Sequence, residues 1–311
     1  MPPAVAVITL AFDPIIRLGG LSVRLETVAI AVVVLVMLLI AARVARRVPA
    51  DPSLDPRLAP GERPRGEEHL RRDDLLFVVL GAIPGAVIGA RLGAVLVHLD
   101  FFTANPAAIF DPSTGSLQLS LAVVGAVIGG AVIGSLLDTP TGRWLHVAAL
   151  PLLVGLGLGK AAGVLGASGM GSPTDVPWAL AYAGSGPWAA LGPGIPSHPS
   201  QVYEGLGALG VLLIVLVLHA AGVFKARDGR AFFVALGLWA VVRLLVAFTW
   251  RDAPVLGPIR ADQLLSLAVL AFSILGFALA PRLLRRYVHQ EEVRVAEGTP
   301  AWPDPATRPP F

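Results

Sequence analysis

The chain has 311 residues, of which 55% are hydrophobic and 14% are charged, and its formal net charge is +3. Soluble domains carry roughly 25% charged residues, so this composition excludes an ordinary soluble globular protein. The chain contains no cysteine, which excludes disulfides, thiolate metal sites and a cysteine nucleophile. Its basic residues lie beside apolar runs, as in membrane proteins, and this placement predicts no nucleic-acid partner.

Apolar runs long enough to cross a bilayer recur along the whole chain. About 20 such residues cover the hydrocarbon core, so the runs predict an all-α integral membrane protein with seven transmembrane helices. Met1–Thr9 lacks the basic start of a signal peptide, and we expect no cleavage there. The predicted spans are Thr27–Ala42, Leu75–Leu99, Leu119–Leu137, Leu145–Gly166, Val202–Ala221, Ala231–Phe248 and Leu264–Ala280.

The loops differ strongly in their basic residues. Most of the 24 lysines and arginines follow spans one, three, five and seven, and basic loops stay in the cytoplasm. The N-terminus is therefore expected outside and the C-terminus in the cytoplasm. On this topology 1–280 is one membrane domain, with a cytoplasmic polar loop at 46–74 and an external loop at 167–201. Residues 281–311 form a cytoplasmic tail that we expect to be partly disordered.

The second span carries glycines every four residues, from Gly81 to Gly93, and the third repeats the theme at Gly125 and Gly129. Small residues at this spacing allow two helix backbones to approach closely. We therefore expect tight helix packing there.

Three basic residues, Arg91, Lys160 and Arg243, lie inside predicted spans. With a rise of ~1.5 Å per residue, they lie roughly 18–24 Å from the cytoplasmic ends of their spans, in one layer. A single cation could bond to backbone carbonyls or extend its tip to the interface. Three at one depth favour a shared anionic ligand, and a lipid phosphate is the natural anion there.

A dense polar motif, His198-Pro-Ser-Gln-Val-Tyr-Glu204, follows the irregular Gly-rich, Ser-rich and Pro-rich segment after Lys160. One interpretation is a helix N-terminus, with Ser200 as the N-cap and Glu204 in the first turns. That interpretation leaves His198, Gln201 and Tyr203 without a role, so we favour a functional site.

This motif resembles the HPSQLYE motif of the bacterial prolipoprotein diacylglyceryl transferases. The resemblance covers most of the chain. Phe12–Arg24 (FDPIIRLGGLSVR) is similar to the entry to that family's first span, and Gly171–Ala179 (GSPTDVPWA) to its segment after span four. Asp74–Phe110 is similar to its second span and the following loop. The resemblance implies a multi-pass protein of the bacterial plasma (inner) membrane.

Enzymes of this family move the diacylglyceryl group of phosphatidylglycerol to the lipobox cysteine of a preprolipoprotein signal peptide. The thiolate attacks a glycerol carbon and glycerol-1-phosphate leaves. The implied partners are phosphatidylglycerol, the signal peptide and membrane lipid, with no cofactor and no metal. The residues expected to bind substrate and lipid phosphate are Lys160, Arg243, Arg251, Arg91, Gly171, Gln201, Tyr203 and Glu204.

The chain departs from the family at several motif positions. The family's HGG motif aligns with Ser120-Leu121-Ala122, so its base histidine is absent. Its GRxGN motif reads Gly159-Lys160-Ala161-Ala162-Gly163, which keeps a cation and loses the asparagine. Further replacements stand at Glu26-Thr27 for a tyrosine, Trp239 for a tyrosine, Ala247 for a glutamate, and Arg251 for an arginine one residue earlier.

The catalytic candidates are therefore His198 and Glu26, as replacement bases, and Ser120, at the aligned position of the lost histidine. A working transferase is the favoured function. A catalytically silent homologue that binds anionic lipid or lipoprotein precursor, and a transferase for another lipid-linked group, remain open. A small-solute transporter is the least favoured, because internally repeated broken helices are not evident.

Overall fold

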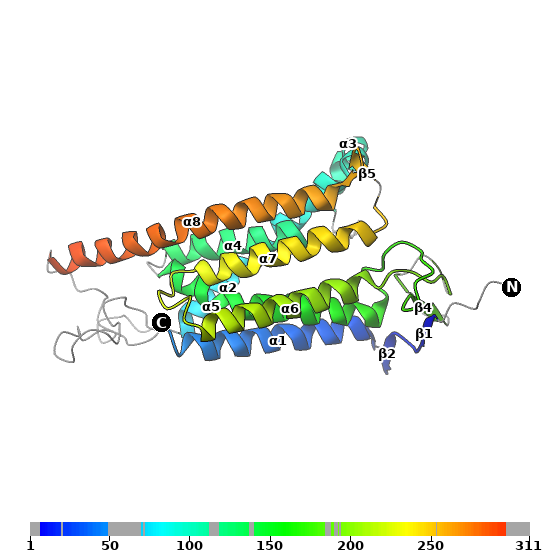
Figure 1. Cartoon of the computed structure of the whole chain (residues 1–311), viewed down its shortest axis with the longest axis horizontal. Helices are drawn as coiled ribbons and strands as arrows, with labels where there is room; N and C mark the ends of the chain where they lie inside the picture. Colours follow the sequence, from blue (N-terminus) through cyan, green and yellow to red (C-terminus); the bar gives the residue numbers. More distant parts are fainter. Residues whose placement is uncertain are drawn as a thin grey trace.

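The computed structural model describes residues 7–19, 21–48, 70, 72–111, 118–136, 140–183, 188–189, 192, 194–252 and 254–296. Within this part of the chain, seven helices are long and apolar enough to cross a membrane, which confirms the predicted number of spans. They run side by side as a bundle (Figure 1). These helices are α1 (Leu25–Ala45), α2 (Arg72–Val97), α4 (Leu119–Leu136), α5 (Thr141–Ala162), α6 (Ser200–Ala220), α7 (Arg230–Val246) and α8 (Ala261–Ala296).

The last helix is longer than the sequence predicted. Its apolar part ends near Arg282, yet α8 continues through Pro281 to Ala296. Proline removes only one backbone hydrogen bond, and the Leu- and Arg-rich sequence that follows favours helix. The described part of the expected disordered tail is therefore helical. Most of the 46–74 loop, and residues 297–311, lie outside the described residues.

Short elements gather mainly at the end of the bundle where α1 begins (Figure 1). The all-α prediction missed three two-stranded sheets there. β1 (Ile8–Ala11) pairs in parallel with β4 (Leu180–Ala183), while β2 (Ile15–Leu18) with β3 (Leu21–Arg24) and β5 (Pro254–Leu256) with β6 (Ile259–Arg260) form antiparallel pairs. The remaining short elements are α3 (Leu99–Ala104), η2 (Pro106–Ile109), η4 (Gly163–Gly166) and η5 (Ala247–Thr249).

The glycine stripes of α2 and α4 face each other, which gives the predicted tight packing of the second span its partner helix. A Cβ added at Gly85 would overlap the carbonyl oxygen of Gly125, and one at Gly89 would overlap that of Leu121. The two backbones are therefore in direct contact, an approach that only residues without a side chain permit.

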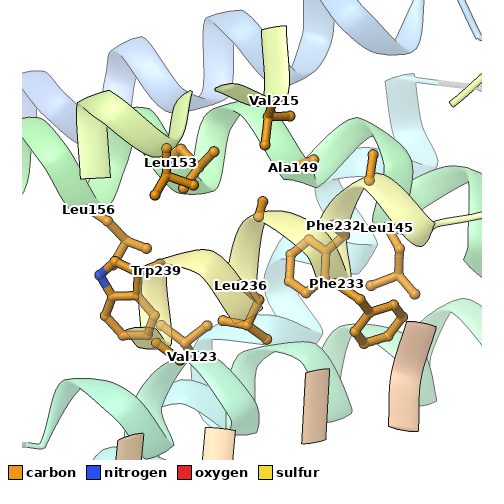
Figure 2. Packing of buried hydrophobic residues seen from close by; sticks show 14 of the residues in the cluster. Val123, Leu145, Ala149, Leu153, Leu156, Val215, Phe232, Phe233, Leu236 and Trp239 are labelled. Atoms are coloured by element: carbon orange, nitrogen blue, oxygen red, sulfur yellow. The ribbon is translucent and has the colours of Figure 1, made fainter. Parts of the chain in front are cut away.

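The core lies between α5, α6 and α7. Trp239 of α7 lies next to Leu156 of α5, whereas Leu236 of α7 points toward Val123 of α4 (Figure 2), and all four are buried. The apolar part of α7 is 61% buried inside the protein, against 17% for that of α1, so α7 is the central helix. Any charge carried by its inner face must therefore find its partners within the protein.

Candidate functional site

Two of the three intramembrane cations meet at one carboxylate. Lys160 Nζ, in the last turn of α5, lies 3.0 Å from Glu204 Oε2. Arg243 Nη1, in the last turn of α7, donates to Glu204 Oε1 at 2.7 Å. Glu204 itself is 1% exposed, on the first turns of α6. Three helices thus contribute one side chain each to a buried ion-pair cluster.

The Arg243 guanidinium bonds to the protein on every side. Its Nε donates to Ser120 Oγ at 2.8 Å, and its Nη2 donates to Asp262 Oδ1 at 3.3 Å. The indole of Trp250 covers it, with the ring centroid 4.4 Å from Cζ. Trp239 lies 5.7 Å from the same atom. These contacts fix the position of the guanidinium.

Asp262 is a second buried carboxylate, at the start of α8. Its Oδ1 also accepts a hydrogen bond of 2.6 Å from Gln118 Nε2. The Gln118 side chain in turn accepts the backbone N–H of Leu121 at 2.9 Å, which caps α4. Hydrogen bonds from Gln118 to Asp262 and from Arg243 to Asp262 therefore link the ends of α4, α8 and α7. We call Lys160, Glu204, Arg243 and Asp262 the charge cluster.

The polar motif His198–Glu204 lies beside this cluster. The interpretation of Ser200 as an N-cap is wrong, because Pro199 holds the cap position and no side chain caps the helix. Ser200 Oγ instead lies 2.6 Å from Thr249 Oγ1 at the end of α7. A Cβ added at Gly171 would collide with both Ser200 Oγ and the Thr249 carbonyl. Gly171 therefore permits the close approach of the segment between η4 and α6, called the outer segment after its predicted side of the membrane, to α6 and η5.

His198, the only histidine in the predicted external segment, is half-buried. Its Nδ1 lies 3.5 Å from Tyr203 Oη, a long contact for a hydrogen bond. Tyr203 Oη also accepts a bond of 2.6 Å from Trp178 Nε1. Gln201 is 1% exposed and donates to Met170 Sδ at 3.2 Å. These side chains form a polar layer next to the charge cluster, in which the contact of the His198 ring is with Tyr203.

A tyrosine secures the outer segment to the end of α5. Tyr182 of β4 is 1% exposed, and its hydroxyl donates to the Val164 carbonyl at 2.7 Å. Burial raises the pKa of Tyr182 to about 12, so the hydroxyl remains a donor throughout the physiological range. The segment that carries Gly171 and His198 is thereby held over the charge cluster.

The expectation that Arg91 joins the other two cations was wrong. Its guanidinium donates to the carbonyls of Ile109, at 2.7 Å, of Asp111, at 2.8 Å, and of Ala108. Phe102 lies under it, with Cζ 5.3 Å from the ring centroid. Arg91 thus holds the segment that contains α3 and η2 against α2, and its donors serve backbone carbonyls.

Arg251 and Glu26 also lie apart from the charge cluster. Arg251 is exposed on the link between α7 and α8, whereas its neighbour Trp250 turns inward onto Arg243. Glu26 starts α1 and accepts a bond of 2.7 Å from Ser168 Oγ. Its carboxylate lies against Gly166, where an added Cβ would overlap Oε2. Glu26 therefore joins α1 to the segment after α5.

Sequence reasoning missed Asp262, Gln118 and Trp250. Gln118 lies directly before the predicted start of span three and Asp262 two residues before that of span seven, so both were assigned to loops. A polar residue within one turn before an apolar run was the available signal. Among the described residues, no group of three or more His, Asp or Glu side chains is placed to hold a metal ion.

The sequence that builds this site is similar to the sequences of known proteins. A model of the prolipoprotein diacylglyceryl transferase family matches residues 14–279. The chain belongs to this family. The match includes six of the seven described helices that can span a membrane and the seventh as far as residue 279, as well as the charge cluster and the polar motif. The departures at Ser120, Lys160 and Trp239 are therefore differences within a shared architecture.

Curated relatives carry the same description. The chain is 28% identical to the phosphatidylglycerol–prolipoprotein diacylglyceryl transferase of Geobacter sulfurreducens over 70% of this chain and 82% of that protein. It is 31% identical to that of Methylocella silvestris, over 71% and 79%. The enzyme of Rhodopseudomonas palustris is also 31% identical, over 65% and 70%. The similarity thus extends over most of each family member.

Proposed function

We propose that this family member transfers the diacylglyceryl group of phosphatidylglycerol to the lipobox cysteine thiol of a prolipoprotein. The observation that carries the proposal is the pair Lys160 and Arg243, buried at one end of the bundle beside the polar motif. Lys160 is the more accessible of the two, with its side chain 22% exposed against 5% for Arg243. The phosphate of the lipid would approach Lys160 first, with Arg243 behind it.

The distribution of basic residues among the loops supports a site near the outer face of the membrane. With the N-terminus outside and the C-terminus in the cytoplasm, the charge cluster lies toward the outer face of the bacterial plasma membrane. A signal peptide would present its cysteine there, at the boundary between hydrocarbon and water. The donor lipid is then available laterally from the same leaflet.

Removal of the thiol proton is the step for which the family histidine is missing. A free thiol has a pKa of about 8.5, and nearby cations lower this value. The exposed side of Lys160 supplies such a charge. His198 is the better remaining candidate for the base, because it is half-buried in the polar layer. Glu26 is bonded to Ser168 and lies against η4, which leaves it less suited.

The direct test is rescue of a bacterial strain depleted of its own diacylglyceryl transferase. We expect the chain to restore growth and to shift the mass of a lipobox peptide by one diacylglyceryl group. His198→Ala should reduce this transfer about a hundredfold, the lower end of the range for loss of a general base. Normal membrane insertion without rescue and without peptide modification would contradict the proposal.

A second candidate is a catalytically silent homologue that binds anionic lipid or lipoprotein precursor. It is favoured by the protein contacts of Arg243, each of whose three nitrogens donates to a protein side chain. A transferase for another lipid-linked group would keep the cations and change the acceptor. Binding of phosphatidylglycerol without transfer would select the silent homologue, and transfer from a different lipid would select the other enzyme.

A further inference from the structure

The charge cluster contains as many carboxylates as cations. Glu204 bridges Lys160 and Arg243, and Asp262 binds the opposite edge of the Arg243 guanidinium. The side chains of Arg243, Glu204 and Asp262 are 5%, 1% and 12% exposed, so water and salt screen them weakly. The formal charge of the four groups is zero.

Removal of the Asp262 carboxylate would leave the bridge between the two cations intact. Glu204 alone connects Lys160 and Arg243, whereas Asp262 touches only Arg243 within the cluster. Gln118 holds the Asp262 carboxylate in place at 2.6 Å. This uncharged partner fixes the position of Asp262 and leaves its negative charge uncompensated on that side. The charge of Asp262 therefore acts chiefly on Arg243.

We propose that Asp262 is a specificity residue that sets the charge of the phosphate site, so that the site takes a singly charged phosphate diester and rejects a doubly charged phosphate monoester. This inference rests on the proposed function, in which the donor lipid is a diester and the leaving glycerol-1-phosphate is a monoester. Without Asp262 the cluster would carry one net positive charge and would retain the monoester more tightly than the diester. With Asp262 present the site releases its product.

The negative charge of Asp262 should weaken the binding of each ligand in proportion to the charge of that ligand. Removing one fixed negative charge changes the electrostatic binding free energy in proportion to the charge of the ligand. At about 10 Å and an effective dielectric constant of about 20, affinity for a singly charged ligand rises roughly tenfold. The same change for a doubly charged ligand is the square, roughly a hundredfold. A phosphate monoester carries nearly two charges at pH 8, because its second pKa is about 6.

Asp262→Asn is the variant of choice, because one asparagine oxygen can accept the bonds from both Arg243 and Gln118 that Oδ1 accepts now. The full chain in neutral detergent would be titrated calorimetrically with glycerol-1-phosphate and with glycerophosphoglycerol, the soluble diester. We expect the diester to bind about tenfold more tightly to the variant than to the wild type, and the monoester about a hundredfold. Asp175→Asn, which removes an exposed carboxylate of the outer segment, is the matched control and should change neither affinity.

Ser120→Asp provides the opposite perturbation and guards against misfolding of the first variant. It adds a carboxylate next to Arg243 Nε, so the affinities for both ligands should fall. The fold-decrease for the monoester should be the square of the fold-decrease for the diester. Equal changes for the two ligands, changes of the wrong sign, or no binding of either ligand would overturn the charge assignment. The transfer assay tests the proposed function separately. If the protein transfers the diacylglyceryl group but the monoester's fold-change is not the square of the diester's, only the role of Asp262 is refuted. If the fold-changes are related in this way but no transfer occurs, only the enzymatic function is refuted.

Discussion

Replacing Glu204 by Gln tests whether the charge cluster holds the bundle together. Glu204 is 1% exposed and bridges Lys160, 3.0 Å away, and Arg243, 2.7 Å away. Breaking a buried ion pair from one side costs about 3–5 kcal/mol, because the remaining charge is left without compensation. Arg243 keeps Asp262, and Lys160 is partly hydrated, so we expect about 3 kcal/mol, the lower end of that range.

The assay is thermal unfolding in detergent, followed by tryptophan fluorescence, since Trp250 and Trp239 both lie against Arg243. A loss of about 3 kcal/mol corresponds to a fall in unfolding temperature of roughly 6 °C, because each kcal/mol shifts this temperature by about 2–4 °C in domains of about 150–250 residues and by less in larger ones. Adding Lys160→Met to Glu204→Gln removes the isolated cation and should recover part of the loss. If the single variant is as stable as the wild type, or if the two changes simply add, the cluster does not act as a unit.

Three further outcomes are expected. Gly89→Ala should destabilise the protein strongly because its Cβ would overlap a carbonyl oxygen of α4, whereas Gly210→Ala meets no atom within 4 Å and should be tolerated; thermal unfolding compares the two. Trp250→Leu should cost about 1–2 kcal/mol by the same assay, through lost cation–π contact with the guanidinium on α7. A cysteine at Asp175 should react with an impermeant thiol reagent in intact cells and one at Lys225 should not, and the reverse labelling would refute the proposed orientation.

Hydropathy was sufficient to predict the seven helices, because each span must satisfy its own backbone in lipid. The four-residue spacing of the glycines on α2 predicted close helix packing, and Gly125 of α4 supplies part of the partner surface. Counting residues along a helix also placed Lys160 and Arg243 at one depth, and the structure joins them through Glu204.

Depth did not predict which neighbours a side chain meets around the bundle. Arg91 lies in the same predicted layer as Lys160, yet it faces the α3 and η2 segment and bonds to carbonyls. Asp262 escaped prediction because its helix starts earlier than the apolar run. The inward turn of Trp250, rather than Arg251, depends on the backbone at the end of α7, which has no periodic signal in the sequence.

The parallel pair of β1 with β4 constrains the order in which the protein can assemble. Ile8 pairs with Leu180, so the two strands are separated in sequence by α1, α2, α4 and α5. Contacts between distant parts of a chain form late, because the intervening segments must first be ordered. β1 therefore has to wait unpaired until α5 is in place. Pairing of β1 with β4 is thus a late contact between distant parts of the chain, and a fusion partner placed directly before β1 would burden that step.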